Sequence, residues 1–245
     1  MLGSAVVYTG LVIAAAGSVL TVNPIPSLPV VTRSQGAAIL GVGILLVSIG
    51  FIAPAPESRV SRVTTRLDEF APAWQFNEVH TIRIAAPPAH VFDAIQRVRA
   101  DEIFLFQTLT WIRRGGRRIP EGILNAGGDE PLIDLATRTG FIRLADDAPR
   151  ELVVGTVISA PRGTRGTLTP QVFQKTLPPG FVLATINFLV TGDGANTSIV
   201  STETRVFANS PSSRRLFAAY WRLIYPGSAI IRRMWLRAIE RRATG

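Results

Sequence analysis

The sequence predicts an α+β protein, in which an antiparallel sheet packs on a long C-terminal helix and two membrane-spanning helices come first. Three observations support this fold class. Two N-terminal stretches, residues 3–22 and 36–53, contain no charged side chain. Segments of strand-like alternation follow between residues 76 and 208. The last thirty or so residues carry an apolar stripe at helical spacing.

The two charge-free stretches predict a transmembrane helical hairpin over residues 1–56. Each stretch is 18 to 20 residues long, and about 20 residues cross the hydrocarbon core of a bilayer. Between them, residues 23–29 are rich in proline, which cannot continue a helix. A signal peptide followed by a buried core helix is the alternative. The first four residues include no basic side chain, which disfavours a signal peptide.

Flanking arginines predict the orientation of the hairpin. The connecting loop holds Arg33, whereas Arg59, Arg62 and Arg66 follow the second helix. The positive-inside rule then places both termini in the cytoplasm. We therefore expect a multi-pass protein of the inner (cytoplasmic) membrane with its soluble domain on the cytoplasmic side, and we expect Arg59, Arg62 and Arg66 to lie at the membrane surface.

Small residues recur on both apolar stretches and predict close helix packing in lipid. They are Gly10, Ala14 and Ser18 in the first, and Gly36, Gly43 and Gly50 in the second. These faces could pack the two helices against each other or against a second copy of the chain, which would give a homo-oligomer.

A soluble domain is expected at residues 74–245, after a juxtamembrane linker or short surface helix at 57–73. Residues 76–84 alternate as a strand, and Pro87-Pro88 then begins a helix at 89–98. The pattern further predicts a short helix at 101–109, strands at 140–144 and 151–159, a turn at 146–149 and a loop at 160–179.

Two strands at 181–191 and 197–208 are expected to form a hairpin around a turn at 192–196. Pairing without a bulge puts Ala184 opposite Thr204 and Thr185 opposite Glu203. Because alternate residues share a face, one face then carries a polar cluster of Thr185, Asn187, Glu203 and Arg205. If that face lines a cavity, Glu203 and Arg205 could orient the polar end of a ligand. If it faces solvent, they form an ordinary surface ion pair.

The C-terminal helix is expected to start at Pro211 with Ser210 as its cap, and Pro226-Gly227 is expected to kink or break it. Eight arginines on this helix face either solvent or anionic lipid headgroups. Nucleic-acid binding is not expected, since it would need a basic groove with stacking aromatics and a bilayer tether is an unusual setting for it.

Composition and motifs exclude several kinds of chemistry. The net charge is +9 and there is no cysteine, so disulfides, thiolate metal sites and cysteine nucleophiles are excluded. The sequence holds no Gly-x-Ser-x-Gly elbow, P-loop or His-Glu-x-x-His helix. His80 and His90 have no metal-ligand spacing, and the acidic group near residue 130 is interpreted as a solvated loop. We expect no metal and no cofactor.

The string HTIRIAAPPAHVFDAI, residues 80–95, resembles the opening of the START-related superfamily called SRPBCC, which includes polyketide-cyclase-like proteins. The matching positions are Ile82, Ile84, Ala86, Pro87, Pro88, Val91 and Phe92. Residues 202–243 also look like an uncharacterised bacterial branch of that superfamily. The resemblance covers residues 74–243. It implies a helix-grip fold, a curved antiparallel sheet around the long helix, with lipids or other apolar molecules held between them in relatives.

The resemblance carries no catalytic residue, because the superfamily has no universal ones, and most relatives lack the membrane hairpin. We therefore expect a membrane-anchored protein that binds a lipid or other apolar ligand. The candidate ligand-binding residues are Glu203, Arg205, Thr185, Asn187, Tyr220 and His80. The alternatives are a cyclase- or dehydratase-like enzyme that uses His80 or Glu203, and a membrane assembly factor without a ligand.

Overall fold

The computed structural model describes residues 2–23, 32–164 and 168–245. The chain divides into two compact units. Unit 1 consists of residues 1–56 and 215–225, and unit 2 of residues 57–214 and 226–245. The proline-rich turn expected at 23–29 lies, beyond its first residue, outside the described residues.

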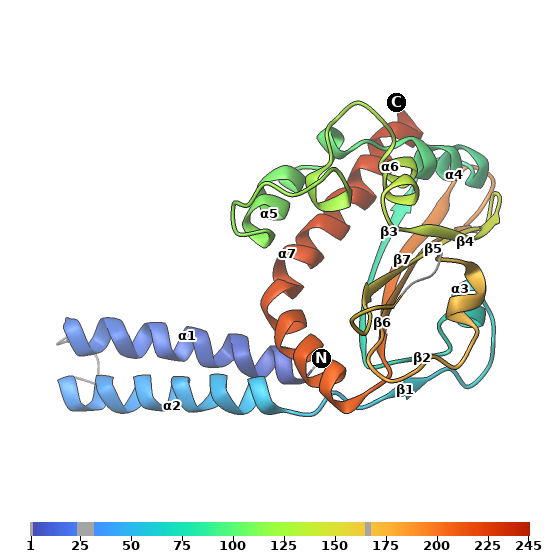
Figure 1. Cartoon of the computed structure of the whole chain (residues 1–245). Coiled ribbons are helices and arrows are strands. Elements are labelled where there is room, and N and C mark those ends of the chain that lie inside the picture. The colour runs from blue at the N-terminus through green and yellow to red at the C-terminus, as the bar shows by residue number, and fades with distance from the viewer. Residues whose placement is uncertain (1, 24–31, 165–167) are drawn as a thin grey trace. The chain divides into compact units, whose positions relative to one another are not determined.

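Unit 1 is built on a pair of helices, α1 (Leu2–Val22) and α2 (Arg33–Ile52), which run side by side (Figure 1). Both are long and apolar enough to cross a membrane. Thr32 caps α2: its hydroxyl accepts from the backbone N–H of Gln35 at 3.3 Å, and the Gln35 side chain accepts from the Thr32 N–H at 3.2 Å.

Glycines set the distance between the two helices. A methyl group on Gly43 would lie 2.3 Å from the backbone nitrogen of Ala14, and one on Gly10 would lie 2.7 Å from that of Val47. The predicted packing of small residues within the hairpin is therefore confirmed, although Ser18 is exposed. Association with a second copy stays a prediction.

Unit 1 also includes residues 215–225 of the long helix α7 (Pro211–Thr244). The Arg222 guanidinium donates to the carbonyl oxygens of Phe51 and Ala53, each at 2.6 Å. Both carbonyls lie at the C-terminal end of α2, where the last carbonyl oxygens of a helix have no N–H donor within the helix. Arg222 therefore caps this end of α2. Burial lowers the pKa of Arg222.

Of the kink or break of α7 expected at Pro226-Gly227, the break is wrong, because the helix runs through these residues without interruption. Proline has no N–H and leaves the carbonyl four residues earlier, that of Arg222, without its helical donor. The Tyr8 hydroxyl donates to that carbonyl instead. The start of the helix is as expected, with Pro211 at the first position and Ser210 accepting from the Ser213 N–H at 3.2 Å.

Unit 2 contains a five-stranded antiparallel sheet that packs against residues 226–244 of α7, which confirms the α+β fold of the helix-grip type (Figure 1). The strand order is β3-β7-β6-β5-β4. The strands are β3 (Phe76–Ile84), β4 (Ile142–Asp147), β5 (Glu151–Ser159), β6 (Val182–Gly192) and β7 (Ser198–Ala208).

Short elements complete unit 2. The α-helices are α3 (Arg66–Phe70), α4 (Pro88–Arg97), α5 (Phe106–Arg113) and α6 (Leu132–Arg138), and the 3-10 turns are η1 (Ala100–Glu102), η2 (Ile123–Asn125) and η3 (Pro170–Phe173). Strand β1 (Ser58–Arg59) pairs with β2 (Ala73–Trp74). Segment 57–73, where we expected a linker or short surface helix, holds β1 and α3, and Leu67 of α3 is completely buried.

The predicted register of the β6–β7 hairpin is wrong by two residues. Ala184 pairs with Val206 and Thr185 with Arg205. The loop keeps five residues but starts one position later, because Gly192 still pairs and the Asp193 N–H donates to the Thr197 carbonyl at 2.8 Å. A slip of two residues preserves which face each side chain takes, so the predicted polar face is correct.

Two smaller expectations also differ from the structure. The helix expected at 101–109 is divided into η1 and α5, since Leu105 between them has a left-handed backbone with φ of 61°. The turn expected at 146–149 starts later, because Asp146 and Asp147 still pair with β5.

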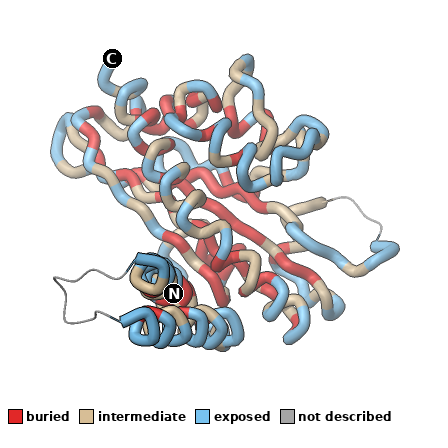
Figure 2. The backbone as a smooth tube through the Cα atoms, turned by 90° about the vertical axis from the view of Figure 1, so that its left-hand side faces the viewer, coloured by how far each residue is buried: buried red, intermediate tan, exposed pale blue. Residues whose placement is uncertain are grey.

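Buried residues run along the strands of the sheet (Figure 2), and side chains from both of its faces belong to buried clusters. On the inner face, the rings of Phe188 and Trp235 of α7 lie 5.1 Å apart within the main core. On the outer face, Val153 and Leu183 pack with α3 and η3 in a second cluster.

Candidate functional site

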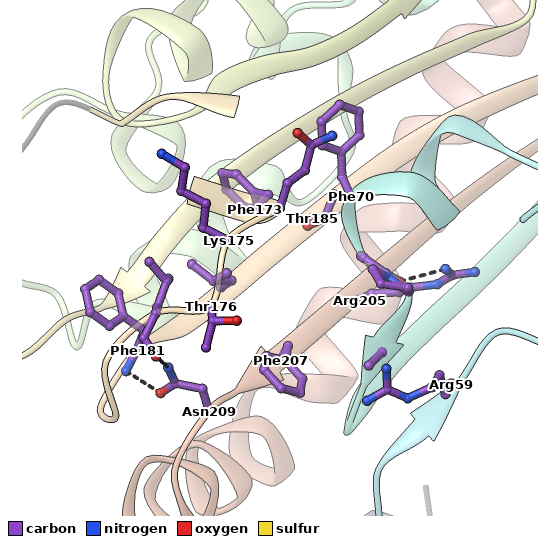
Figure 3. Close-up of a pocket in the computed structure, with 16 residues that line it drawn as sticks. Arg59, Phe70, Phe173, Lys175, Thr176, Phe181, Thr185, Arg205, Phe207 and Asn209 are labelled. Atoms are coloured by element: carbon purple, nitrogen blue, oxygen red, sulfur yellow. Dashed lines mark hydrogen bonds between the residues drawn. The ribbon is translucent and has the colours of Figure 1, made fainter. Parts of the chain in front are cut away.

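A pocket with a volume of about 470 Å³ lies on the outer face of the sheet, the face turned away from α7 (Figure 3). Leu183 and Thr185 of β6 and Arg205 of β7 point to this side, because their neighbours Ala184 and Val206 point to the other. The superfamily resemblance implied a ligand space between sheet and helix, whereas this pocket lies on the opposite side of the sheet.

Four phenylalanines from four different segments provide the apolar lining. Phe70 comes from α3, Phe173 from η3, Phe207 from β7 and Phe181 from the residue before β6. All four surround the pocket in Figure 3. Aromatic walls with a few polar groups are the usual composition of a pocket for an apolar ligand.

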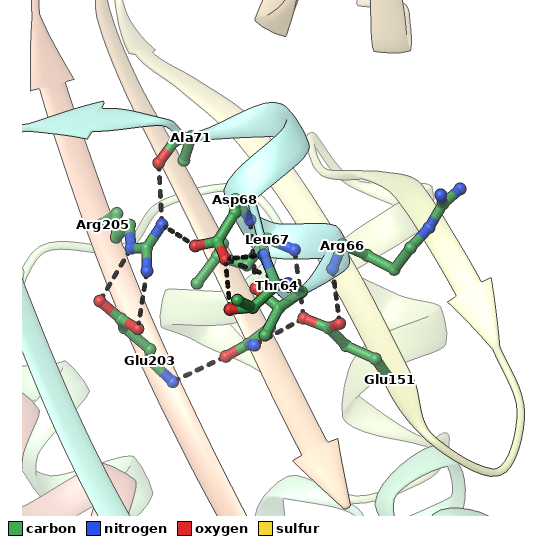
Figure 4. Close-up of polar contacts among 10 residues, drawn as sticks. Thr64, Arg66, Leu67, Asp68, Ala71, Glu151, Glu203 and Arg205 are labelled. Atoms are coloured by element: carbon green, nitrogen blue, oxygen red, sulfur yellow. Dashed lines mark hydrogen bonds and ion pairs between the residues drawn. The ribbon is translucent and has the colours of Figure 1, made fainter. Parts of the chain in front are cut away.

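Arg205 forms one wall of the pocket and is held in a buried ion-pair network (Figure 4). Its Nη1 donates to Asp68 Oδ1 at 2.8 Å and to the Ala71 carbonyl at 3.0 Å. Its Nε and Nη2 donate to the two carboxylate oxygens of Glu203 at 2.8 and 3.2 Å. The guanidinium also stacks over the Trp74 ring at 4.1 Å. Four of the five N–H donors of the guanidinium are therefore used. Because two of these bonds go to Asp68 and Ala71, Arg205 fixes α3 on the sheet.

The network shifts the pKa values of Asp68 and Arg205. Burial raises the pKa of the Asp68 carboxyl, but hydrogen bonds from Thr64, Arg205 and Thr65 outweigh burial and lower that pKa to about 2. Burial lowers the pKa of Arg205, whereas Glu203 and Asp68 raise it by more. Asp68 and Arg205 are therefore both charged near neutral pH, and they form an ion pair at 2.8 Å.

Glu151, completely buried at the start of β5, holds α3 from its other end. Its carboxylate accepts from the backbone N–H of Arg66 at 2.7 Å and of Leu67 at 3.1 Å. It also accepts from the Asn187 side chain at 2.7 Å. An anion is favourable at the first N–H groups of a helix, which have no partner within the helix, so Glu151 positions the wall that carries Phe70.

The rim of the pocket carries the groups that remain accessible. Lys175 is exposed, and Arg59 is paired with Glu57 at 2.8 Å but stays largely in solvent. Asn209 accepts from the N–H groups of Gly180 and Phe181, each at 2.8 Å, and so fixes the loop that bears Phe181. A ligand would therefore find walls of phenylalanines with Arg205 and Thr185 among them, and cationic side chains at the entrance.

The structure brings together some of the residues named from the sequence and separates others. Thr185 and Arg205 line the pocket. Asn187 and Glu203 share that face but are occupied by hydrogen bonds with Glu151 and Arg205. Tyr220 belongs to unit 1, and His80 lies on the inner face of the sheet.

Of the three arginines expected at the membrane surface, Arg59 also lines the pocket, Arg66 pairs with Glu69 at 2.8 Å, and Arg62 is exposed. Sequence reasoning missed Asp68, Glu151 and the four phenylalanines. Phe207 and Phe181 had a signal, since on the predicted strands they share a face with Arg205 and with Thr185 respectively.

His80 belongs to a separate polar cluster on the inner face of the sheet. Its Nε2 lies 2.6 Å from Glu78 Oε1, and the Ser228 hydroxyl of α7 donates to Glu78 Oε2 at 2.8 Å. Nearby, Thr204 Oγ1, Arg232 Nη1 and Trp235 Nε1 are buried without a hydrogen-bond partner among the described residues. Burial lowers the pKa of Arg232 to about 10, although Glu78 partly offsets this.

No group of three or more His, Cys, Asp or Glu side chains is placed to hold a metal ion within residues 2–23, 32–164 and 168–245. The acidic residues near position 130 are engaged with arginines: Glu130 pairs with Arg138, and Asp134 pairs with Arg143 at 2.9 Å.

No protein-family model matches this chain, and no curated protein matches it. Among solved structures, the chain is similar to the di-domain ARO/CYC protein BexL from the BE-7585A biosynthetic pathway, with 15% sequence identity and a TM-score of 0.30. The match covers 86% of this chain and 58% of BexL, so the chain spans less than two thirds of that protein. A likeness at this score carries no argument about activity.

Proposed function

We propose that this chain is a membrane-anchored binding protein that takes an apolar ligand with an anionic end into the outer-face pocket of unit 2. In this proposal α1 and α2 span the inner membrane, both termini and unit 2 lie on the cytoplasmic side, and unit 2 is a divergent member of the START-related superfamily. The ligand is a lipid or a lipid-like metabolite drawn from the adjacent bilayer.

The pocket itself is the observation that carries this proposal. A volume of about 470 Å³ with four phenylalanines in its lining falls in the range of about 300 to 1,000 Å³ that is usual for small-molecule sites. Arg205 is already neutralised by Asp68 and Glu203, so it does not attract an anion into the interior. Lys175, exposed at the rim, is left for the charged end of the ligand, and Arg59, which is paired with Glu57, lies in the same lining.

The test is a titration of the full chain in lipid nanodiscs with a fluorescent long-chain fatty acid. Leu183→Trp fills the pocket, because Leu183 lines it. Leu189→Trp is the matched control, since this leucine lies on the same strand and the same face, six residues away, and is not part of the lining. We expect Leu183→Trp to weaken binding at least tenfold and Leu189→Trp to leave it unchanged. Equal affinities for both variants, or no binding by the parent chain, would disprove the proposal.

A second candidate function, the cyclase- or dehydratase-like enzyme, is favoured by the inner-face cluster of Glu78, His80 and Ser228. Arg233 Nε donates to His80 Nδ1 at 3.4 Å, and the other ring nitrogen, Nε2, faces Glu78. An acid next to an imidazole, with unpartnered donors around it, has the composition of a general acid–base site.

His80 and Glu203 cannot serve one active site together, because they lie on opposite faces of the sheet. An enzyme that works on the inner face should lose turnover of a polyketide-like substrate in Glu78→Gln and His80→Ala and keep it in Glu203→Gln. Loss in Glu203→Gln alone, or unchanged turnover in all three variants, argues against this candidate.

A further inference from the structure

Exposed apolar side chains lie within and just before helix α5 of unit 2; Figure 1 shows the place of this helix in the fold. Phe104 is 66% exposed, Trp111 54% and Ile112 59%. Large apolar side chains exposed in such proximity on one short segment are unusual for a surface that meets only water. We call Phe104, Leu105, Trp111 and Ile112, with the arginines that follow them, the α5 patch.

The backbone holds these side chains outward. Ile103 and Phe106 are buried in the main core, whereas Phe104 and Leu105 between them are exposed. Leu105 has a left-handed backbone, with φ of 61°, a conformation that is strained for a branched residue and is kept where the surroundings impose it. Phe106 and Thr110 then anchor the inner side of α5, so that Trp111 and Ile112 stay on the outer side.

Four arginines follow directly. Residues 103–120 contain Arg113, Arg114, Arg117 and Arg118 and no acidic residue. Arg114 is bonded to Asn125, whereas Arg117 and Arg118 are exposed and pair with no carboxylate in the described part of the chain. The turn is tight, and a methyl group on Gly116 would lie 3.2 Å from the Trp111 ring, so glycine allows the indole to lie beside the basic segment.

We propose that the α5 patch is a second membrane contact, which docks onto an anionic bilayer surface. Exposed Trp, Phe and Ile beside several arginines are the chemistry of interfacial segments: the apolar side chains enter the boundary region while the cations meet anionic headgroups. The hairpin tethers the patch near such a surface at a high effective concentration. This inference rests on the membrane anchor of the proposed function, but not on the pocket or its ligand.

The absence of cysteine allows single nitroxide labels on the full chain, reconstituted into phosphatidylcholine vesicles with and without phosphatidylglycerol. Ile112→Cys reports the patch. Ile44→Cys, exposed in the middle of α2, reports the anchor, and Val79→Cys, exposed on β3, reports a control surface. Oxygen concentrates in lipid, whereas a nickel complex stays in water. In vesicles with phosphatidylglycerol, we expect the label at Ile112→Cys to be highly accessible to oxygen and poorly accessible to the nickel complex. The label at Val79→Cys should remain accessible to the nickel complex.

Charge-matched variants identify the headgroup contribution. Removing both charges in Arg117→Gln with Arg118→Gln should lower the ratio of docked to free label about 30-fold. Arg83→Gln with Arg97→Gln, both exposed in unit 2, changes the net charge equally and should leave the ratio within about twofold.

The outcomes separate this inference from the anchor. If Ile44→Cys reads as lipid-embedded and Ile112→Cys as water-exposed, the patch is not a membrane contact although the anchor stands. If Ile44→Cys also reads as water-exposed, both fail. The nitroxide spectrum at residue 112 could instead broaden as the protein density in the vesicles rises, to the same extent with and without phosphatidylglycerol. That result would assign the patch to contact with a second copy of the chain and would overturn the proposal.

Discussion

Replacing Arg205 by methionine tests whether the buried network holds the pocket wall. The substitution keeps the length of the apolar stem and removes the cation that joins β7 to Asp68 of α3. It leaves two carboxylates facing the position that the guanidinium occupied. If Arg205 is the element that fixes α3 on the sheet, that helix should open far more readily in Arg205→Met.

The expected cost follows from burial and from the partners that remain. Removing one member of a buried ion pair costs about 3 to 5 kcal/mol. Asp68 keeps the hydrogen bonds from Thr64 and Thr65, and the Glu203 side chain is 19% exposed and can recover water. Both facts favour the lower end of the range, so we expect about 3 kcal/mol, or roughly 100-fold faster opening of α3.

The assay is hydrogen exchange by mass spectrometry on the full chain in nanodiscs, read at the amides of α3 and β7. Arg83→Met is the control, because the Arg83 side chain is 69% exposed and its pair with Asp193 should be worth at most about 1 kcal/mol. Adding Asp68→Asn should restore part of the loss. A change in Arg205→Met no larger than that in Arg83→Met would refute the structural role of this network.

Three further predictions follow from the same contacts. Folding lowers the pKa of Asp68 from its ordinary 3.8 to about 2, so its carboxylate contributes about 2 kcal/mol to the free energy of unfolding. This contribution should be complete above pH 4 and lost as pH falls toward 2. Urea unfolding of the full chain at a series of pH values should show this loss of stability, and Asp68→Asn should make the stability less dependent on pH. Glu151→Gln puts an NH₂ donor or a neutral oxygen against two helix N–H groups, so unfolding should become easier by about 1 to 3 kcal/mol; an unchanged midpoint would contradict the capping role. Gly43→Val must separate the helices at Ala14 and should lower the free energy of unfolding by about 1 to 3 kcal/mol. Gly41→Ala is the control, because it has open space around it and should not lower the melting temperature in detergent. Equal melting temperatures for the two variants would contradict the close packing.

Local patterns in the sequence were sufficient for the five strands of the main sheet and for the polar face of the hairpin, but not for β1 and β2. The alternation before Pro87 and Pro88 predicts β3 with the bounds that the structure has, because prolines end a strand sharply. The β6–β7 pairing was off by two residues, yet the face of Thr185 and Arg205 was right, since a two-residue slip does not turn side chains over. A repeating pattern thus predicts which side a residue faces better than it predicts its partner.

The composition of the site depended on contacts between distant parts of the chain. The Asp68–Arg205 pair spans 137 residues and the Arg66–Glu151 bond spans 85. Both exist only because α3 folds onto the outer face of the sheet, and a segment of five helical residues has too short a pattern to predict that docking. The superfamily resemblance implied a ligand space under the long helix, whereas the pocket lies beside α3 and η3 on the other face of the sheet.

The central claim is that the outer-face pocket holds a ligand, and mass spectrometry of small molecules extracted from the purified full chain tests it most directly. The account predicts one apolar compound with an acidic group, near-stoichiometric with the parent chain and with Leu189→Trp and absent from Leu183→Trp. The same compound in equal amounts in all three preparations, or no compound in the parent chain, would contradict the account.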